Sequence, residues 1–323
     1  MAELVCLDDI RAAATRIAGR VVRTPLIPFA GPAAPGRAEH PLWLKPESLQ
    51  PTGAFKLRGA FNAILQRLDD AREHGVVTHS SGNHARAVAW VARELGLEAT
   101  IVMPDAAPAV KVDAVRALGA SVVIVDSAER DTRAFELAAE RGYVMIPPYD
   151  DAAIVAGQGT IGLEIIADLP SVNGVVVPVS GGGLISGIAT AVKALSPATR
   201  VIGVEPELAA DAAESLGRGE IVSWTTEQTY RTIADGLRVT SVGQVPWRQI
   251  REYVDDIITV SEDEIRDGVR RLAGDARLVA EPSGAVPFAA WLHRFESLGV
   301  TGDVVAVVSG GNLALDTLAA LIG

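Results

Sequence analysis

One lysine in this sequence of 323 residues stands in a setting suited to covalent chemistry. Lys56 lies in the segment 51–59, at the glycine-marked start of a predicted helix over 54–68. An amine beside Phe55 and small residues can lose its hydration, which lowers its pKa and makes it a nucleophile able to form a Schiff base. Taken alone, the segment also fits a helix lysine whose ammonium group reaches solvent.

Residues 80–84 (Ser-Ser-Gly-Asn-His) form a second chemical feature, where a predicted strand ends and a predicted helix over 83–95 begins. The first-turn N–H groups of a helix and the helix dipole both favour negative charge, so this turn suits an anion such as a carboxylate. The alternative is an ordinary serine N-cap with a glycine turn. Both interpretations remain open from these residues alone.

Residues 180–184 (Ser-Gly-Gly-Gly-Leu) place three consecutive glycines after a buried strand, which lets backbone amides approach a phosphate closely. A rival interpretation is a dinucleotide site, whose loose glycine fingerprint would be Gly181, Gly183 and Gly187. Glu205 then ends the next strand, where a ribose-binding acid is expected. However, the glycine spacing differs by one residue from that fingerprint, and a dinucleotide enzyme leaves the lysine segment without a task. A phosphate site is the preferred interpretation.

A third turn, 309–312 (Ser-Gly-Gly-Asn), follows the last predicted strand and could place a hydroxyl under a ligand. Other catalytic schemes find little support. The five histidines show no close paired spacing for zinc, and no Gly-x-Ser-x-Gly elbow of a hydrolase occurs.

The composition, the N-terminal sequence and one uncharged stretch argue against several classes of protein. A net charge of -11 without a Lys/Arg cluster argues against a nucleic-acid partner. A single cysteine, Cys6, cannot form an internal disulfide, which indicates a reducing compartment, here the cytoplasm. The N-terminus lacks the pattern of a signal peptide and predicts a helix capped at Asp8 or Asp9. The uncharged stretch 173–192 contains Pro178 and several glycines, which predicts a strand, a loop and a helix rather than a membrane span.

Short β-branched runs alternate with helix-length segments, which predicts an α/β protein with parallel sheets. The predicted strands are 75–78, 99–103, 121–125, 174–179, 200–204 and 303–308. Further predicted helices are 110–118, 184–195 and 262–272. The strands fall into two groups separated by the turn-rich segment 146–151, so we expect two open parallel-sheet domains with a cleft between them. Residues 31–36 are expected to be a surface connection.

In their order, the motifs resemble those of the fold-type-II pyridoxal-phosphate enzymes, specifically the serine/threonine dehydratase and serine racemase group. The motifs are PTGAFKLRGAFNA, SSGNHA, AGQGT, SGGGL, GVEP, TIADGL, EPSGA and VVSGGN, and they span nearly the whole chain. The resemblance implies a tryptophan synthase β-like fold and a homodimer. It implies a large cofactor-binding domain of residues 1–72 and 151–323 and a small domain of residues 73–150.

The resemblance also implies roles toward pyridoxal 5'-phosphate. Lys56 matches the Schiff-base lysine, and Phe55 lies beside the cofactor. Asn83 would hydrogen-bond the ring hydroxyl, and Ser309 would face the pyridine nitrogen. A neutral hydroxyl there makes the ring a weaker electron sink, which favours elimination over transamination. The phosphate would rest on the backbone amides of Ser180, Gly181, Gly182, Gly183 and Leu184.

The implied reaction is β-elimination from L-serine, L-threonine or a close β-hydroxy amino acid, which gives a 2-oxo acid and ammonia. The Lys56 amine, once freed, would remove the Cα proton as general base. The substrate carboxylate would rest on Ser80, Ser81 and His84.

A divalent-cation site is also implied, at Glu205, Ala209 and Asp211. Oxygen ligands favour a hard ion such as Mg²⁺ or Ca²⁺, with Mn²⁺ as a further option. The alternative is a helix N-terminus that is merely rich in acids.

Two residues keep other members of the group open. Ser81 matches a serine that reprotonates Cα in racemases, so serine racemase is an alternative, although Ala85 and Val239 depart from the racemase pattern. Arg130 matches an arginine that contacts a second carboxylate, which keeps a 3-hydroxyaspartate ammonia-lyase open. Outside the group, an NAD-dependent oxidoreductase or a cofactor-free binding protein would be the competing class.

Overall fold

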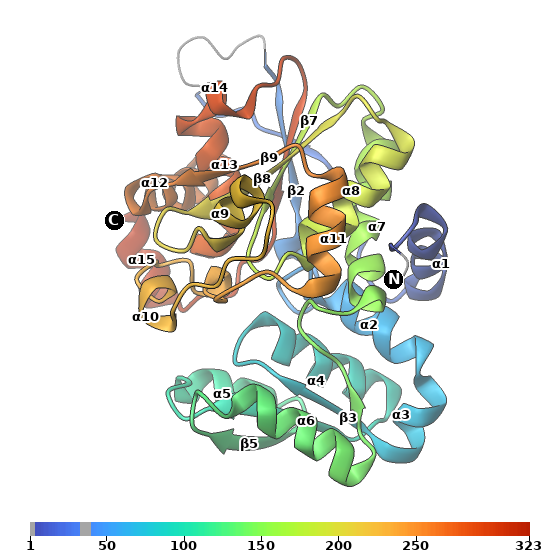
Figure 1. Ribbon diagram of the computed structural model, residues 1–323. Coiled ribbons are helices and arrows are strands. Elements are labelled where there is room, and N and C mark those ends of the chain that lie inside the picture. Colours follow the sequence, from blue (N-terminus) through green and yellow to red (C-terminus); the bar gives the residue numbers. More distant parts are fainter. Residues whose placement is uncertain (1–3, 33–39) are drawn as a thin grey trace.

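The computed structural model describes residues 4–32 and 40–323, whose strands form two separate sheets (Figure 1). The six-stranded sheet lies in the upper body of Figure 1 and the four-stranded sheet in the lower body. The expected α/β class with parallel-sheet domains is therefore confirmed. Most of the expected surface connection 31–36 lies outside the described residues.

The larger sheet has the strand order β1-β2-β10-β7-β8-β9. Each neighbouring pair is parallel except β1 and β2, which are antiparallel. The strands are β1 (Ile27–Pro28), β2 (Leu42–Pro46), β7 (Gly174–Pro178), β8 (Arg200–Pro206), β9 (Asp256–Val260) and β10 (Val304–Val308).

Helices cover both faces of this sheet, which explains its continuous apolar strands. One face packs against α12 (Glu262–Gly274) and α13 (Pro282–His293). The other packs against α7 (Ala152–Asp168), α8 (Gly183–Leu195) and α11 (Gln244–Tyr253). Along β10, Val304 and Val308 belong to the first core, whereas Val305 and Val307 belong to the second.

The smaller sheet has the order β5-β4-β3-β6, with all pairs parallel. Its strands are β3 (Val76–His79), β4 (Ala99–Pro104), β5 (Ser121–Val125) and β6 (Val144–Met145). One face packs against α4 (Asn83–Leu95) and α5 (Ala109–Arg116), and the other against α6 (Arg130–Arg141).

Helix α2 (Lys56–Gln66) joins the two bodies, because it contacts both α4 and α7. Figure 1 shows α2 between the upper and lower sheets. Its residues Leu57, Ala60 and Phe61 share a core with α4 and the smaller sheet. The helix that begins with Lys56 is therefore held from both sides.

The remaining elements are peripheral helices and single turns. They are α1 (Leu7–Ile17), η1 (Glu47–Leu49), α3 (Leu68–His74), α9 (Asp211–Arg218), α10 (Thr226–Thr229), η2 (Asp235–Leu237), α14 (Phe295–Leu298) and α15 (Leu315–Ile322).

All six predicted strands are present, with ends that differ by at most two residues from β3, β4, β5, β7, β8 and β10. The prediction that Asp8 or Asp9 caps the first helix is wrong. Cys6 is the N-cap, and Asp9 lies in the first turn, where its carboxylate accepts the Cys6 backbone N–H at 2.9 Å. Asp9 is therefore the N3 residue of a capping box, whose side chain pairs the free backbone N–H of the N-cap residue.

The uncharged stretch 173–192 forms β7 and α8, as predicted. Within residues 4–32 and 40–323, none of the helices combines the length and the apolar character that crossing a membrane requires.

Candidate active site

Lys56 opens α2, and its side chain turns toward the loop that follows β6. Its Nζ donates a hydrogen bond to the Pro148 carbonyl at 2.7 Å and lies 5.1 Å from the centre of the Phe55 ring. Burial lowers the pKa of Lys56 to about 8, because desolvation disfavours the ammonium form. A neutral fraction of the amine therefore exists near neutral pH, as a Schiff-base nucleophile requires.

Tyr149 connects this amine with the triple-glycine bend. It follows Pro148 directly, and its ring carbons lie 2.4 to 2.5 Å from where a Cβ on Gly181 would stand. A side chain at Gly181 would therefore collide with the ring. At Gly182, φ is +87°, a left-handed conformation that also favours glycine. The Lys56 amine and the bend thus meet at the same loop.

The bend carries buried backbone donors without partners. Residues 181–184 are all buried, and no hydrogen bond within the described part of the chain is donated by their backbone N–H groups. Nearly all buried backbone N–H groups in folded proteins have a hydrogen-bond partner. Free N–H groups at the start of a helix favour anions. Ser180 stands at the edge of the bend, where its Oγ accepts the Val239 N–H at 3.4 Å. This set of donors fits a phosphate group.

The residues of the rival dinucleotide fingerprint are engaged in packing and in hydrogen bonds within the protein. A Cβ on Gly187 would lie 2.2 Å from the Val155 carbonyl oxygen, so close packing of α8 on α7 requires this glycine. Glu205 is completely buried and accepts backbone N–H groups from α9. Both of its carboxylate oxygens are thus already engaged by the start of α9.

The 80–84 turn leads into α4 without a serine cap. The N-cap is Gly82, and no side chain caps the helix, so the serine N-cap interpretation is wrong. The Ser80 hydroxyl instead accepts the Gly82 N–H at 3.2 Å. Ser81 beside it is half-buried.

His84 enters the same region as a neutral imidazole. Its Nε2 lies 2.9 Å from the Ile146 carbonyl oxygen, which can only accept, so Nε2 carries the hydrogen. Its Nδ1 is then an acceptor, buried and without a partner in the described structure. Burial and the nearby Lys56 lower the pKa of His84 to about 3. His84 therefore offers an acceptor beside the lysine rather than a positive charge.

Ser309 is buried beside the lysine segment. Its backbone carbonyl accepts the Phe55 N–H at 3.0 Å, and the next residue, Gly310, forms an isolated bridge with Ala54. Asn83, from the other body, donates to the Glu281 carboxylate at 2.6 Å. The predicted ring-contacting residues therefore lie on neighbouring segments.

Arg130 is engaged elsewhere. Its Nε lies 2.9 Å from Asp131 Oδ1, and the Nδ1 atom of His79 lies 2.8 Å from the same oxygen. His79 directly precedes Ser80, so this polar cluster borders the 80–84 turn. A contact of Arg130 with substrate stays a prediction, because Asp131 already neutralises its charge.

Two of the three expected cation ligands, Glu205 in β8 and Asp211 at the start of α9, are buried carboxylates close enough for the charge of Asp211 to act on Glu205. Glu205 and Asp211 are 0% and 1% exposed. Glu205 accepts the N–H groups of Ala212 and Ala213 at 3.2 and 2.8 Å. Asp211 Oδ2 is buried without a partner among the described residues, and burial raises the pKa of Asp211 to about 7. No cluster of three or more His, Cys, Asp or Glu side chains suited to a metal lies in the described ranges.

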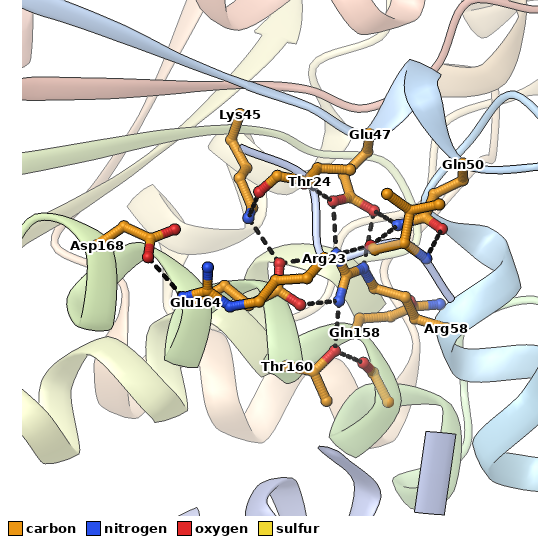
Figure 2. Close-up of polar contacts among 12 residues, drawn as sticks. Arg23, Thr24, Lys45, Glu47, Gln50, Arg58, Gln158, Thr160, Glu164 and Asp168 are labelled. Atoms are coloured by element: carbon orange, nitrogen blue, oxygen red, sulfur yellow. Dashed lines mark hydrogen bonds and ion pairs between the residues drawn. The ribbon is translucent and has the colours of Figure 1, made fainter. Parts of the chain in front are cut away.

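A buried ion network holds the start of α2 (Figure 2). Arg58 donates to both oxygens of Glu47, each at 2.8 Å, and to both oxygens of Glu164, at 2.6 and 2.9 Å. Lys45 of β2 donates to Glu164 at 2.6 Å. Burial acts to lower the pKa of Arg58, but the two carboxylates raise it above its ordinary value. Two cations thus balance two carboxylates beneath the helix that carries Lys56.

Sequence reasoning missed three contributors: Tyr149, Glu281 and the Arg58 network. Glu281 stands in the EPSGA motif, but nothing in that motif indicates a role for its acid. Arg58 stands two residues after Lys56, but its partner Glu164 is 106 positions away in the chain. For Tyr149, only the neighbouring Pro147 and Pro148 mark the position as a turn.

Comparison with known proteins agrees with this arrangement. The family model described as "Pyridoxal-phosphate dependent enzyme" matches residues 17–310. The catabolic L-threonine dehydratase TdcB of Escherichia coli (strain K12) is 41% identical over 322 residues, which cover 99% of this chain and 96% of that protein.

Solved structures give the same result. The threonine deaminase of T.th. superposes with a TM-score of 0.88 and 43% identity, over 96% of this chain and 99% of that one. Maize serine racemase superposes with a TM-score of 0.90 and 38% identity, over 98% and 97% of the two chains. With the family model and these relatives in agreement over almost its whole length, the chain belongs to the fold-type-II family of pyridoxal-phosphate-dependent enzymes.

Proposed function

We propose that the protein is a pyridoxal-phosphate-dependent ammonia-lyase that converts L-threonine or L-serine to a 2-oxo acid and ammonia. The observation that carries this proposal is that one loop contacts both groups: Pro148 accepts from the Lys56 amine, and Tyr149 packs on the bend whose amides at residues 181–184 have no partner among the described residues. The full-length similarity to a threonine dehydratase supports the choice of substrate.

The residues present fit the cofactor. The amides of residues 181–184 would hold its phosphate, Asn83 its ring hydroxyl, and the hydroxyl of Ser309 its ring nitrogen. When bound, pyridoxal phosphate supplies an electron sink for charge that develops at Cα. Lys56 would anchor it covalently and, when neutral, accept the Cα proton of the substrate. Loss of the β-hydroxyl as water and hydrolysis of the remaining enamine account for both products.

The 80–84 turn would orient the substrate. The first-turn N–H groups of α4 favour its carboxylate. Burial and, to a lesser extent, the charge of the nearby Lys56 lower the pKa of His84, whose Nδ1 is a buried acceptor without a partner among the described residues. Because His84 is neutral, it would donate no proton to the amine that must act as base.

Serine racemase is the second candidate, favoured by Ser81 and by the similarity to maize serine racemase. With L-serine, we expect 2-oxo acid formation to exceed D-serine formation. Ser81→Ala is expected to abolish D-serine formation and to spare elimination of the L-isomer. A coupled keto-acid assay and chiral chromatography on L-serine, L-threonine and 3-hydroxyaspartate measure this. D-serine as the main product would identify the protein as a serine racemase instead. Preference for 3-hydroxyaspartate would indicate that Arg130 contacts the second carboxylate of the substrate.

We further propose that Glu205, Asp211 and the Ala209 carbonyl bind a divalent cation. The support is the buried, unpartnered Asp211 Oδ2 beside a second buried carboxylate. Mg²⁺, Ca²⁺ or Mn²⁺ at about a hundredfold excess over Kd should stabilise the fold by about 2.7 kcal/mol, and so raise Tm by several degrees. Asp211→Asn should remove this increment. The matched control Asp263→Asn, at a 98% exposed side chain, should keep it. An unchanged Tm with all three ions would contradict the cation site.

The domain limits and the assembly also belong to this proposal. We propose a large domain of residues 1–72 and 151–323 and a small domain of residues 73–150, because the strands within 76–145 form their own sheet. We also propose a homodimer, on the family resemblance, and a cytoplasmic location, where the free and exposed Cys6 would stay reduced.

A further inference from the structure

A chain of four side chains crosses from the exposed surface to the buried end of the candidate site. It runs from Arg86 through Asn312 and Asn83 to Glu281. Arg86 Nη1 donates to Asn312 Oδ1 at 2.8 Å, Asn312 Nδ2 donates to Asn83 Oδ1 at 2.8 Å, and Asn83 Nδ2 donates to Glu281 Oε1 at 2.6 Å. Arg86 and Asn83 belong to α4, whereas Asn312 and Glu281 belong to the other body.

The direction of this chain is set by the partners whose hydrogen-bonding role cannot change. A guanidinium group can only donate, so the Asn312 atom that faces Arg86 is the oxygen. The Thr52 carbonyl can only accept, and Asn312 Nδ2 donates to it at 2.7 Å. Both contacts demand the same orientation of the Asn312 amide. Its nitrogen then faces Asn83, whose oxygen must accept.

Asn83 is therefore left with its nitrogen directed into the site. One of its N–H groups donates to Glu281, and no hydrogen bond among the described residues uses the second. This second N–H is the donor that the ring hydroxyl oxygen of the cofactor would need. A reversed amide would turn its oxygen toward the ring hydroxyl and toward Glu281, and so would remove the N–H donors that both contacts use.

The backbone is shaped around this chain. Gly53 has φ of +75°, and a Cβ there would lie 2.4 Å from Asn312 Oδ1. A Cβ on Gly310 would lie 2.4 Å from Glu281 Oε1. Two glycines from separate motifs thus leave room for Asn312 and Glu281. Burial, together with the negative charge of Asp235, raises the pKa of Glu281 to about 8.

We propose that Asn312 and Arg86 are positioning residues that hold the Asn83 amide with its donor, and not its oxygen, toward the cofactor ring. Neither residue touches the reacting atoms. The inference rests on the proposed function, because it concerns the residue assigned to the ring hydroxyl. It extends that function to an exposed arginine and to the last residue of the SGGN turn.

Asn312→Asp and Asn312→Ala test the direction of the chain. Aspartate can accept from Arg86 as asparagine does, but it cannot donate to Asn83 Oδ1, so it should reverse the Asn83 amide. Alanine only releases that amide. We expect the Kd for pyridoxal phosphate, measured by equilibrium dialysis, to rise roughly threefold to tenfold in Asn312→Ala and by more than about tenfold in Asn312→Asp. The Tm of the apoenzyme should be higher in Asn312→Asp than in Asn312→Ala, because the introduced carboxylate would pair with Arg86.

Arg86→Met and Arg86→Gln form a matched pair at the exposed end of the chain. Methionine removes the donor and should weaken cofactor binding roughly threefold, whereas glutamine keeps a donor and should remain within about twofold of wild type. If the network only stabilises the fold, Asn312→Ala should bind pyridoxal phosphate more weakly than Asn312→Asp, or both variants should keep the wild-type Kd. Either result overturns the inference. A wild-type protein that binds no pyridoxal phosphate would overturn the proposed function instead.

Discussion

Lys56→Ala is expected to lower ammonia-lyase activity on L-threonine by at least about 10⁴-fold, because one side chain serves as both the covalent anchor and the base. The structure gives no substitute among the described residues, since the neighbouring imidazole, His84, has a pKa of about 3 and donates its Nε2 hydrogen to the Ile146 carbonyl. Steady-state keto-acid formation measures the loss. Lys193→Ala, which removes a lysine of α8 that is paired with Asp255, is the matched control and should keep activity.

The pH dependence of cofactor uptake tests the same amine without turnover. The neutral amine is the nucleophile, so the rate at which apoenzyme takes up pyridoxal phosphate should rise as pH increases through about 8 and level off above it. About half of the Lys56 amines are neutral at pH 8, against under about one in a hundred at the ordinary pKa of about 10.4. A rate that continues to climb toward pH 10 would show that burial does not lower the pKa of this lysine.

Arg58→Met is expected to lower the free energy of unfolding by about 3 to 5 kcal/mol, the largest effect on stability that we predict. Arg58 is fully buried and joins Glu47 to Glu164 (Figure 2). Its removal leaves two carboxylates against Lys45 alone, and a buried charge without a partner is costly. Urea denaturation of the apoenzyme measures the loss. Exposed Arg11→Met is the control and should change stability by less than about 0.5 kcal/mol.

A double variant separates the lost ion pair from simple loss of packing. Adding Glu47→Gln to Arg58→Met removes the carboxylate that the arginine left behind, so part of the stability should return. If the two losses add without recovery, packing rather than charge balance is the cause. A loss below about 1 kcal/mol for Arg58→Met would contradict the anchoring role of the network.

The sequence reveals six strands with continuous apolar residues, because helices cover both faces of each sheet. It does not reveal β2, in which Lys45 interrupts the apolar pattern. That lysine is tolerated inside the sheet because it donates to the Thr24 carbonyl and to Glu164 of α7, and a charged partner 119 positions away leaves no local signal. Helix α13 is missed for a different reason, because Pro282 and Pro287 lie within it and proline usually signals the end of a helix.

The residues of the candidate site also differ in whether the local sequence marks them. Residues at strand-to-helix turns, such as those at 80–84 and 180–184, can be identified because turn residues and glycines mark them locally. Tyr149 and Glu281 take their places through topology: one follows β6 in the smaller sheet, and the other precedes α13 in the larger body. The pairing of Arg130 with its neighbour Asp131 depends on side-chain orientation, which the order of residues does not specify.

Borohydride reduction of the protein loaded with pyridoxal phosphate, followed by peptide mass spectrometry, identifies the amine that carries the cofactor. Reduction fixes the cofactor to whichever amine carries it. We predict a single phosphopyridoxyl adduct, on Lys56, at about one per chain. An adduct on Lys45, Lys111 or Lys193 in its place, or no adduct at all, would show that Lys56 is not the Schiff-base lysine.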